Sequence, residues 1–339
     1  MMKKIKTTEA VGHVLQHDIT EIIPGEFKGR VFKKGHIITE ENISHLLRLG
    51  KDHIFVFELG EDKIHENEGA MILGKLGQGE NISLGSEIKE GKINFNSSID
   101  GILKVDSEKL FELNMLGEIS FATLPNNIPV KKGELVGGAR IIPLVIEKEK
   151  MDRAKSLIKD PILNVRPYKK YKVGIITTGN EVFYGRIKDK FGPVILEKLK
   201  PYNSEIIGQA LCPDDKEIIK EKAREFLDKG ATMIIFTGGM SVDPDDMTPT
   251  SIIELGGELI SYGAPVLPGS MFLLSYLGDI PMMGLPGCVM FAKKTVFDLV
   301  LGRVMTGEKL TKADIMRYAT GGLCQSCEVC HYPNCTFGK

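Results

Sequence analysis

The stretch that decides the fold is residues 231–249, which read ATMIIFTGGMSVDPDDMTP. The run 231–236 is apolar rather than alternating, which predicts a strand buried on both faces of a parallel sheet. Two glycines follow it, and glycine at a strand end lets backbone N–H groups approach an anion closely. Three acids then precede Thr248, which is suited to cap a helix, and Pro249, which is suited to the first helical turn. The stretch therefore predicts a site for a phosphorylated ligand and a metal.

The sequence on both sides of this stretch alternates between expected strands and expected helices. Strands are expected at 171–176 and 204–210, and helices at 193–199 and near 289–304. Such alternation predicts an α/β domain in three layers, with a mostly parallel sheet covered by helices on both faces. Ligands bind such sheets beyond the carboxyl ends of the strands. Four turns are therefore expected on one rim: Thr177–Glu181, Thr237–Asp246, Pro268-Gly269 and Leu285–Gly287.

Local signals also predict where individual helices begin. Asp214 and Glu217 have the spacing of a capping box, so Asp214 is expected to cap a helix that ends at Gly230. Thr39 is expected to cap a short helix at 41–50.

Changes of composition along the chain predict five regions. Residues 1–67 are expected to form a small α/β region, and residues 68–146, where glycines separate short apolar stretches, a β-rich domain. A charged, mostly helical linker is expected at 147–170. It leads to the three-layer domain at 171–310, which a cysteine-rich tail follows at 311–339.

The overall composition is that of an ordinary globular protein. The chain has 339 residues, of which 42% are hydrophobic and 26% charged, and its formal net charge is −1. A protein that binds nucleic acid in general is usually basic, so no nucleic-acid partner is expected. No apolar stretch is long enough to span a bilayer, and no apolar segment follows the basic start. We therefore expect a cytoplasmic protein without a membrane partner.

The rim turns resemble those of the molybdopterin-binding domain family of molybdenum cofactor biosynthesis, and most closely its molybdopterin molybdotransferase branch. The Asp246-Met247-Thr248-Pro249 segment also resembles the Asp-x-Thr-Pro of relatives that adenylylate molybdopterin. Several such motifs in one order are a specific signal, whereas any one alone is weak. The motifs that carry the resemblance are Thr178-Gly179-Asn180-Glu181, Thr237-Gly238-Gly239-Met240-Ser241, Pro268-Gly269 and Leu285-Pro286-Gly287.

The resemblance implies a ligand, a reaction and a set of site residues. The ligand is molybdopterin, a pterin dithiolene that carries a phosphate or an AMP group. The reaction is Mg²⁺-assisted insertion of molybdate into adenylated molybdopterin, with release of AMP. Asp246, Asp189 and Lys190 are the implied catalytic residues, and Asp243, Asp245 and Asp246 the implied Mg²⁺ ligands. The implied ligand-binding residues are Thr178, Gly179, Asn180, Glu181, Thr237, Gly238, Gly239, Ser241, Pro268, Gly269, Leu285, Pro286 and Gly287.

The resemblance also implies partners: a homodimer, and a molybdoenzyme apoprotein that receives the cofactor. The sequence departs from the family pattern at several points. Asn180 replaces the usual acid, Lys190-Phe191 follows Asp189 in place of Ser-Asn, and Ser270 follows Pro268-Gly269 in place of Lys-Pro. These departures keep open a protein that binds or delivers the cofactor without catalysis. A nucleotide hydrolase is a further alternative, as is a purely structural role for the glycines and acids.

The tail contains four of the six cysteines, spaced Cys-x2-Cys-x2-Cys-x4-Cys from Cys324 through Cys327 and Cys330 to Cys335. Crowding of this kind is not typical of a disulfide scaffold and favours metal binding. The first three cysteines match a bacterial ferredoxin run, which predicts an iron–sulfur cluster. Zinc is the alternative, because His331 is adjacent. A thiol relay or a tail without metal also stays open.

Overall fold

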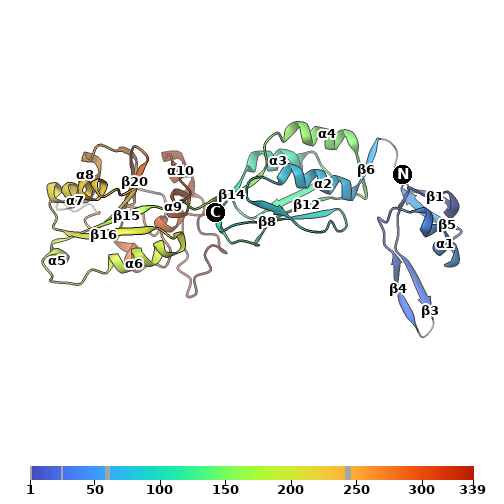
Figure 1. Cartoon of the computed structure of the whole chain (residues 1–339), viewed down its shortest axis with the longest axis horizontal. Coiled ribbons are helices and arrows are strands. Elements are labelled where there is room, and N and C mark those ends of the chain that lie inside the picture. Colours follow the sequence, from blue (N-terminus) through green and yellow to red (C-terminus); the bar gives the residue numbers. More distant parts are fainter. Residues whose placement is uncertain (1, 24–25, 58–61, 241–245) are drawn as a thin grey trace. The chain divides into compact units, whose positions relative to one another are not determined.

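The computed structural model describes residues 2–23, 26–57, 62–240 and 246–339 (Figure 1). The described chain forms two compact units. The first unit comprises Met1–Asn126 and Val130–Val165, and the second Asn127–Pro129 and Arg166–Lys339. Among the helices within these described ranges, none combines the length and the apolar character needed to cross a bilayer.

The first unit begins with a three-stranded antiparallel sheet in the order β1-β5-β2 and a hairpin of β3 and β4. Helix α1 (Glu40–Arg48) follows the hairpin in sequence. The Thr39 N–H donates a 3.0 Å hydrogen bond to Oδ1 of Asn42, which confirms Thr39 as the helix cap. The strands are β1 (Met2–Lys6), β2 (Val14–Leu15), β3 (Ile19–Ile23), β4 (Phe27–Phe32) and β5 (His53–Phe57).

The rest of the first unit is built on a four-stranded antiparallel sheet in the order β10-β12-β8-β7. Helix α2 (Glu66–Gly77) packs on this sheet. Gly69, Gly74 and Gly77 do not separate short strands, as the β-rich prediction for this region had it, but lie buried in α2. A Cβ on Gly77 would lie 2.6 Å from ring atoms of Phe95 and Phe121, so its absence lets the helix lie directly on the sheet. The strands are β7 (Ile82–Leu84), β8 (Lys92–Ser97), β10 (Ile119–Thr123) and β12 (Leu135–Ile141).

Replacement of Gly77 by alanine is expected to destabilise the first unit. The added methyl group overlaps two buried rings, and overpacking of this kind costs about 1–3 kcal/mol. Urea unfolding followed by circular dichroism would measure the loss. Lys75→Ala in the same helix is the matched control, because Lys75 is exposed and surface substitutions change the free energy of unfolding by less than about 0.5 kcal/mol. Equal stabilities of the two variants would contradict the packing argument.

The remaining elements of the first unit include the charged stretch at 147–170 as far as Val165. Its helix α4 buries Met151 and Ala154, whereas most of its charged side chains are exposed, as the sequence predicts for a solvated face. The elements are β6 (Lys63–His65), β9 (Gly101–Val105), α3 (Ser107–Met115), β11 (Pro129–Val130), β13 (Val145–Glu147), α4 (Lys148–Leu157) and β14 (Leu163–Pro167), which ends at the start of the second unit.

The second unit contains a six-stranded sheet in the order β16-β15-β17-β20-β19-β18. The first four strands are parallel, and β19 and β18 extend the sheet in antiparallel fashion. This confirms the predicted mostly parallel sheet. The strands are β15 (Lys172–Thr178), β16 (Glu205–Cys212), β17 (Met233–Thr237), β18 (Glu258–Tyr262), β19 (Leu273–Leu277) and β20 (Ile280–Leu285).

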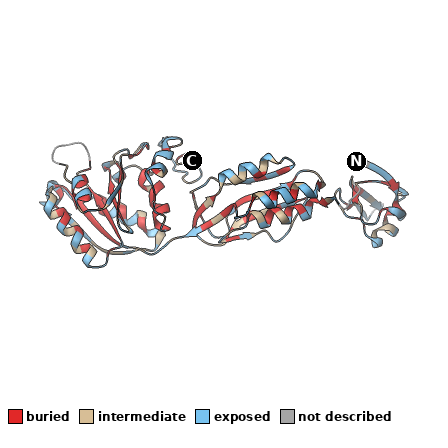
Figure 2. Ribbon diagram, turned by 90° about the horizontal axis from the view of Figure 1, so that it is seen from above, coloured by how far each residue is buried: buried red, intermediate tan, exposed pale blue. Residues whose placement is uncertain are grey.

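Two hydrophobic cores cover the two faces of this sheet and confirm the three-layer α/β fold. Ile175 and Ile235 face one core together with α6 (Phe191–Leu199) and α9 (Val296–Met305). Their sequence neighbours face the other core together with α7 (Lys216–Asp228) and α8 (Thr248–Glu254). Burial on both faces explains why the central strands are apolar throughout (Figure 2).

Three local predictions for the second unit are wrong. Asp215, not Asp214, caps α7, and its Oδ1 accepts from the N–H groups of Glu217 and Ile218. Thr248 is the first residue of α8 rather than its cap. The last helix begins at Val296, because Gly287–Met290 forms a separate 3₁₀ turn.

A buried ion-pair network connects α9 to α10 (Lys312–Met316), the helix at the start of the tail. Arg303 of α9 is 4% exposed. Its Nη2 lies 2.8 Å from Oε1 of Glu308 and 2.8 Å from Oδ1 of Asp314. Burial alone would raise the pKa of Asp314, but hydrogen bonds from Thr311 and Arg303 outweigh it and lower the pKa to about 2.

This network predicts a pH-dependent contribution to stability. The pKa of Asp314 is lower in the folded state, so its contribution is present above about pH 4 and is lost as the pH falls toward 2. Asp314→Asn is therefore expected to lower the free energy of unfolding more at pH 5 than at pH 3, as measured by urea unfolding. Lys312→Gln in the same helix, outside the network, should show the same small effect at both pH values. A loss for Asp314→Asn that does not change with pH would contradict the assignment.

Candidate functional site

The candidate site lies where the parallel strands of the second unit end. Thr177 pairs with Thr237, and Thr237 with Leu285, so the carboxyl ends of β15, β17 and β20 lie level. The side chains here are buried and connected: the Thr237 hydroxyl donates to Oγ1 of Thr177 at 3.2 Å. Oγ1 of Thr178 lies 2.9 Å from Oγ1 of Thr248, which ties the first turn to the start of α8. Hydroxyl groups therefore connect the turns after β15 and β17 to each other and to the start of α8.

The two glycine turns approach each other closely. Gly238 has φ +81°, and a Cβ on it would overlap the carbonyl oxygen of Thr178. Gly239 and Gly179 also have positive φ, at +51° and +136°. Only glycine satisfies both the backbone angle and the close approach at residue 238. Glycine turns of this kind allow an anion to approach backbone N–H groups closely.

These turns border a cavity of about 400 Å³, which we call the rim pocket. The structure brings together seven of the predicted site residues there: Thr178, Gly179, Glu181, Lys190, Gly238, Gly239 and Asp246. Other lining residues were not predicted as site residues: Val182, Ile187, Lys188, Phe191, Asp214 and Met290. The pocket thus combines glycine turns, acids, two lysines and an apolar side.

Other predicted residues lie elsewhere. Thr237 and Leu285 are fully buried beneath the rim. Asn180, Asp189, Gly269, Pro286 and Gly287 do not line the rim pocket, and Pro268 lines a second pocket, described below. Ser241, Asp243 and Asp245 lie outside the described residues.

Asp214 is the acid that sequence reasoning missed. Asp215 caps α7, and the carboxylate of Asp214 instead contacts the rim turn Thr177–Glu181. There its Oδ2 accepts from the Asn180 N–H at 3.0 Å. Oδ1 of Asn180 in turn accepts from the Asp214 N–H at 3.4 Å. Asp214 thus places a carboxylate beside Asn180, which stands where the resemblance expects an acid. The sequence did contain a signal for this acid. Two adjacent aspartates follow β16, and a helix cap needs only one of them, so the other is left for a different role.

Both carboxylate oxygens of Asp189 accept hydrogen bonds. Its Oδ1 accepts from the Phe191 N–H at 2.8 Å, and its Oδ2 from the Gly192 N–H at 3.0 Å and from Nε2 of Gln209 at 2.6 Å. These contacts fix the start of α6 at Phe191, and Asp189 itself lies between Lys188 and Lys190. Neither lysine has an ion-pair partner within the described parts of the chain. Both are therefore available to an anion in the rim pocket.

The rim pocket contains side-chain oxygen atoms of the kind that bind Mg²⁺. Asp214 and Asp246 offer carboxylate oxygens, and Mg²⁺ is commonly held by one or two carboxylates together with substrate phosphates. Outside the segment 241–245 and the other undescribed residues, no three histidine, cysteine or acidic side chains are placed to hold a metal by themselves. The assignment of Mg²⁺ to Asp243, Asp245 and Asp246 stays a prediction.

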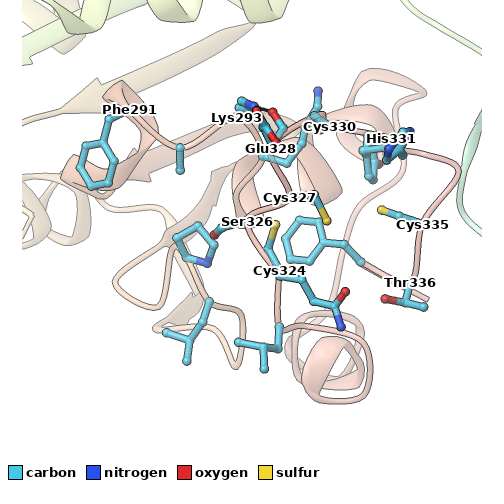
Figure 3. Close-up of a pocket in the computed structure, with 18 residues that line it drawn as sticks. Phe291, Lys293, Cys324, Ser326, Cys327, Glu328, Cys330, His331, Cys335 and Thr336 are labelled. Atoms are coloured by element: carbon cyan, nitrogen blue, oxygen red, sulfur yellow. Dashed lines mark hydrogen bonds between the residues drawn. The ribbon is translucent and has the colours of Figure 1, made fainter.

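The tail forms a docked loop beside a second pocket of about 760 Å³, which we call the cysteine pocket (Figure 3). The ends of the cysteine loop (residues 321–338) meet, because the Gly338 N–H donates to the Gly321 carbonyl at 2.9 Å. The Leu267 N–H donates to the Gly322 carbonyl, and the Cys324 N–H to the Leu267 carbonyl, both at 2.8 Å. Phe337 is 3% exposed and packs in the core of the second unit.

All four tail cysteines line the cysteine pocket, together with His331. Cys324 and Cys335 are partly buried, whereas Cys327 and Cys330 are exposed. The four thiols are thus brought to one pocket. They are not closed into a ligand set, since no metal-holding group of three or more such side chains occurs in the described chain.

The other two cysteines do not line either pocket. Cys212 is buried at the end of β16, and burial raises the pKa of its thiol to about 11. Cys288 is partly buried in the 3₁₀ turn Gly287–Met290, and burial also raises its pKa. A raised pKa leaves both thiols protonated and weakly reactive at neutral pH.

Comparison with family models gives two matches. Residues 174–306 match a family described as a probable molybdopterin binding domain, which covers the sheet, the rim and α9. Residues 4–58 match a domain of unknown function.

Comparison with curated proteins and solved structures gives partial matches. The chain is 29% identical over 218 residues to the molybdopterin molybdenumtransferase of Haemophilus influenzae, covering 59% of this chain and 52% of that protein. It is 32% identical over 95 residues to a CinA-like protein of Mycobacterium avium, covering 28% of this chain and 22% of that protein. The matched part thus spans about half or less of these relatives.

Among solved structures, the molybdopterin biosynthesis enzyme MoaB of Thermus thermophilus is 26% identical. The match covers 41% of this chain and 98% of that chain, with a TM-score of 0.35. The molybdopterin biosynthesis MoeA protein of Pyrococcus horikoshii is 16% identical, and the match covers 90% of this chain and 75% of that chain, with a TM-score of 0.33.

Proposed function

Since residues 174–306 are a domain of the molybdopterin-binding family of molybdenum cofactor biosynthesis, we propose that the protein binds molybdopterin or its adenylate in the rim pocket and inserts molybdate into it. The relatives named as molybdopterin molybdenumtransferases support this activity. The single observation that carries the proposal is the rim pocket itself. It unites the Thr178-Gly179 and Gly238-Gly239 turns with Asp246 and with two lysines that lack an ion-pair partner in the described chain.

Each part of the pocket suits one part of an adenylated pterin. Backbone N–H groups at glycine turns favour phosphate oxygens. Lys188 and Lys190 offer positive charge to the phosphoanhydride, and Asp189 positions both by fixing the start of α6. Val182, Ile187 and Met290 give the pocket an apolar side suited to a flat ring. Mg²⁺ held by Asp246, with Asp243 and Asp245, would neutralise charge on the phosphates during AMP release.

The alternative is a protein that binds or delivers the cofactor without catalysis. Ser270 stands where the family resemblance expects a lysine after Pro268-Gly269, and Pro268 lines the cysteine pocket instead of the rim pocket. The basic residue that the resemblance would place beside the ligand is therefore missing at that turn. In this alternative the cysteine loop serves as a redox-sensing or docking element for a recipient molybdoenzyme apoprotein.

We also propose that the cysteine loop binds metal, as an iron–sulfur cluster or as a zinc tetrathiolate. The support is the donor set: four thiols within twelve residues that line one pocket, with His331 beside them. Bound metal would order a loop that otherwise has few backbone hydrogen bonds between residues 325 and 330. A homodimer belongs to the proposal through the family resemblance alone.

The experiment is anaerobic purification followed by two measurements. Bound pterin is extracted and detected by fluorescence, and iron and zinc are quantified in the same sample. AMP release from adenylated molybdopterin is then followed with and without Mg²⁺ and molybdate. Release that needs both supports the transferase, whereas bound pterin without AMP release supports the delivery protein. The absence of bound pterin, with phosphate-bond cleavage of ADP-ribose instead, would overturn both in favour of a nucleotide hydrolase.

A further inference from the structure

One short segment separates the rim pocket from the cysteine pocket. In this segment Met290 lines the rim pocket, whereas residues 291–294 line the cysteine pocket. The segment is internally bonded: the Val289 N–H donates to the Pro286 carbonyl at 3.1 Å, and the Ala292 N–H to the Cys288 carbonyl at 2.9 Å. We call residues 286–294 the shared wall. These bonds place Met290, which faces the rim pocket, and Ala292, which faces the cysteine pocket, in one hydrogen-bonded turn.

The cysteine loop has two anchored thiols and two unanchored ones. Cys324 is held by its backbone bond to Leu267, and Cys335 packs against the core of the second unit. Cys327 and Cys330 lie on the exposed part of the loop between them. A metal that binds all four thiols must therefore draw residues 327–330 toward Cys324 and Cys335, since metal–thiolate bonds are only about 2.3 Å long.

Lys293 connects this moving part of the loop to the shared wall. Its Nζ donates to the carbonyl oxygen of Glu328, which lies between Cys327 and Cys330 (Figure 3). The neighbouring Lys294 makes a different contact. Its Nζ lies 3.1 Å from Oδ1 of Asp298 and 5.1 Å from the ring centroid of Tyr332, both of which lie outside the 327–330 segment. Lys293 is thus the residue of the shared wall that is hydrogen-bonded to the 327–330 segment.

We propose that closure of the cysteine loop around a thiolate-bound metal is transmitted through Lys293 to the shared wall and strengthens ligand binding in the rim pocket. The second half of this statement rests on the proposed function of the rim pocket. The physical reason is conformational entropy. Metal binding orders the cysteine loop and the shared wall, so the protein loses less conformational entropy when a rim ligand that also orders Met290 binds afterwards. Coupling of this kind is reciprocal: each ligand raises the affinity for the other by the same factor. The usual range of that factor begins at about fivefold.

The first test needs no rim ligand. Metal-free protein is prepared anaerobically, and amide hydrogen exchange of the peptide covering residues 286–294 is compared with and without Zn²⁺. Exchange there is expected to slow when one Zn²⁺ binds to the native protein. In Lys293→Gln the Zn²⁺ stoichiometry should remain one while the slowing in the wall is lost. Glu328→Gln is the matched control, because it keeps the backbone carbonyl that accepts from Lys293, and it should behave as the native protein.

The second test measures the coupling itself. ADP with Mg²⁺ is titrated calorimetrically into metal-free and Zn²⁺-loaded protein, and the loaded form is expected to bind at least about fivefold more tightly. Lys293→Gln should bind ADP equally in both forms. Failure to bind Zn²⁺, unchanged exchange in the wall, or preserved coupling in Lys293→Gln would each overturn the inference. Failure of ADP to bind in both forms, with the exchange result intact, would count against the proposed function of the rim pocket and not against the Lys293 link.

Discussion

Gly238→Ala is expected to produce the largest loss of stability of any single methyl addition at the rim. Two costs combine at this residue. Its φ of +81° is disfavoured for any residue with a Cβ, and backbone strain of this type costs about 1–3 kcal/mol. The new Cβ would also overlap the Thr178 carbonyl oxygen, which belongs to a strand end and cannot move aside as a flexible side chain would. We expect a total loss of at least about 3 kcal/mol in the free energy of unfolding of the second unit.

Gly230→Ala separates the two costs. Gly230 follows α7 with φ +84°, nearly the same angle, but a Cβ there meets no atom within 4 Å. It should therefore show the backbone cost alone, about 1 kcal/mol. Urea unfolding of both variants under one set of conditions gives the comparison. Similar losses in the two variants would show that the Thr178 carbonyl yields to the methyl group, and would remove the argument that residue 238 must be glycine.

Asp246→Asn is expected to lower the rate of Mg²⁺-dependent AMP release by at least about 100-fold, or about 2.7 kcal/mol in activation free energy. Asparagine has nearly the same shape as aspartate, so the packing of the rim should be kept while the negative charge that attracts Mg²⁺ is removed. Binding of the pterin, measured by fluorescence, should change by no more than a few fold. The separation of binding from turnover is the mark of a residue that acts mainly in the transition state.

Asp228→Asn is the matched control for this substitution. Asp228 is exposed at the end of α7 and lies outside the rim pocket, so loss of its charge should leave AMP release unchanged. AMP release by Asp246→Asn at the native rate would remove Asp246 from the reaction. It would favour the protein that only binds or delivers the cofactor.

The central sheet could be predicted because its signals are local. Residues 231–236 are apolar without alternation, and the structure buries β17 on both faces. The glycines that follow it do adopt the positive φ angles that their residue type suggests. The antiparallel strands β18 and β19 were not predicted, because direction is set by pairing with β20 and leaves no distinct mark in short apolar runs.

The sequence does not show which of two similar neighbouring residues takes a given role, and the incorrect assignment at the site is of this kind. Asp214 and Asp215 both satisfy the rule for a helix cap, and only the path of the chain decides that Asp215 caps α7 and Asp214 contacts Asn180.

The glycines of α2, outside the site, cannot be told from turn glycines by composition alone. The role of Gly77 follows from the rings of Phe95 and Phe121, which lie on other elements of the first unit.

The sequence by itself determined the class of fold, the resemblance of the central domain to the molybdopterin-binding family and the glycine turns that border the rim pocket, because strand periodicity, glycine conformation and motif order are properties of neighbouring residues. Only the tertiary structure decided that Asp189 accepts from Gln209, that Asp214 enters the rim pocket and that Pro268 borders the cysteine pocket. It also decided that a tail far along the chain docks beside the shared wall. These facts join residues that are distant in sequence, and such contacts are fixed by how the packed elements meet in space.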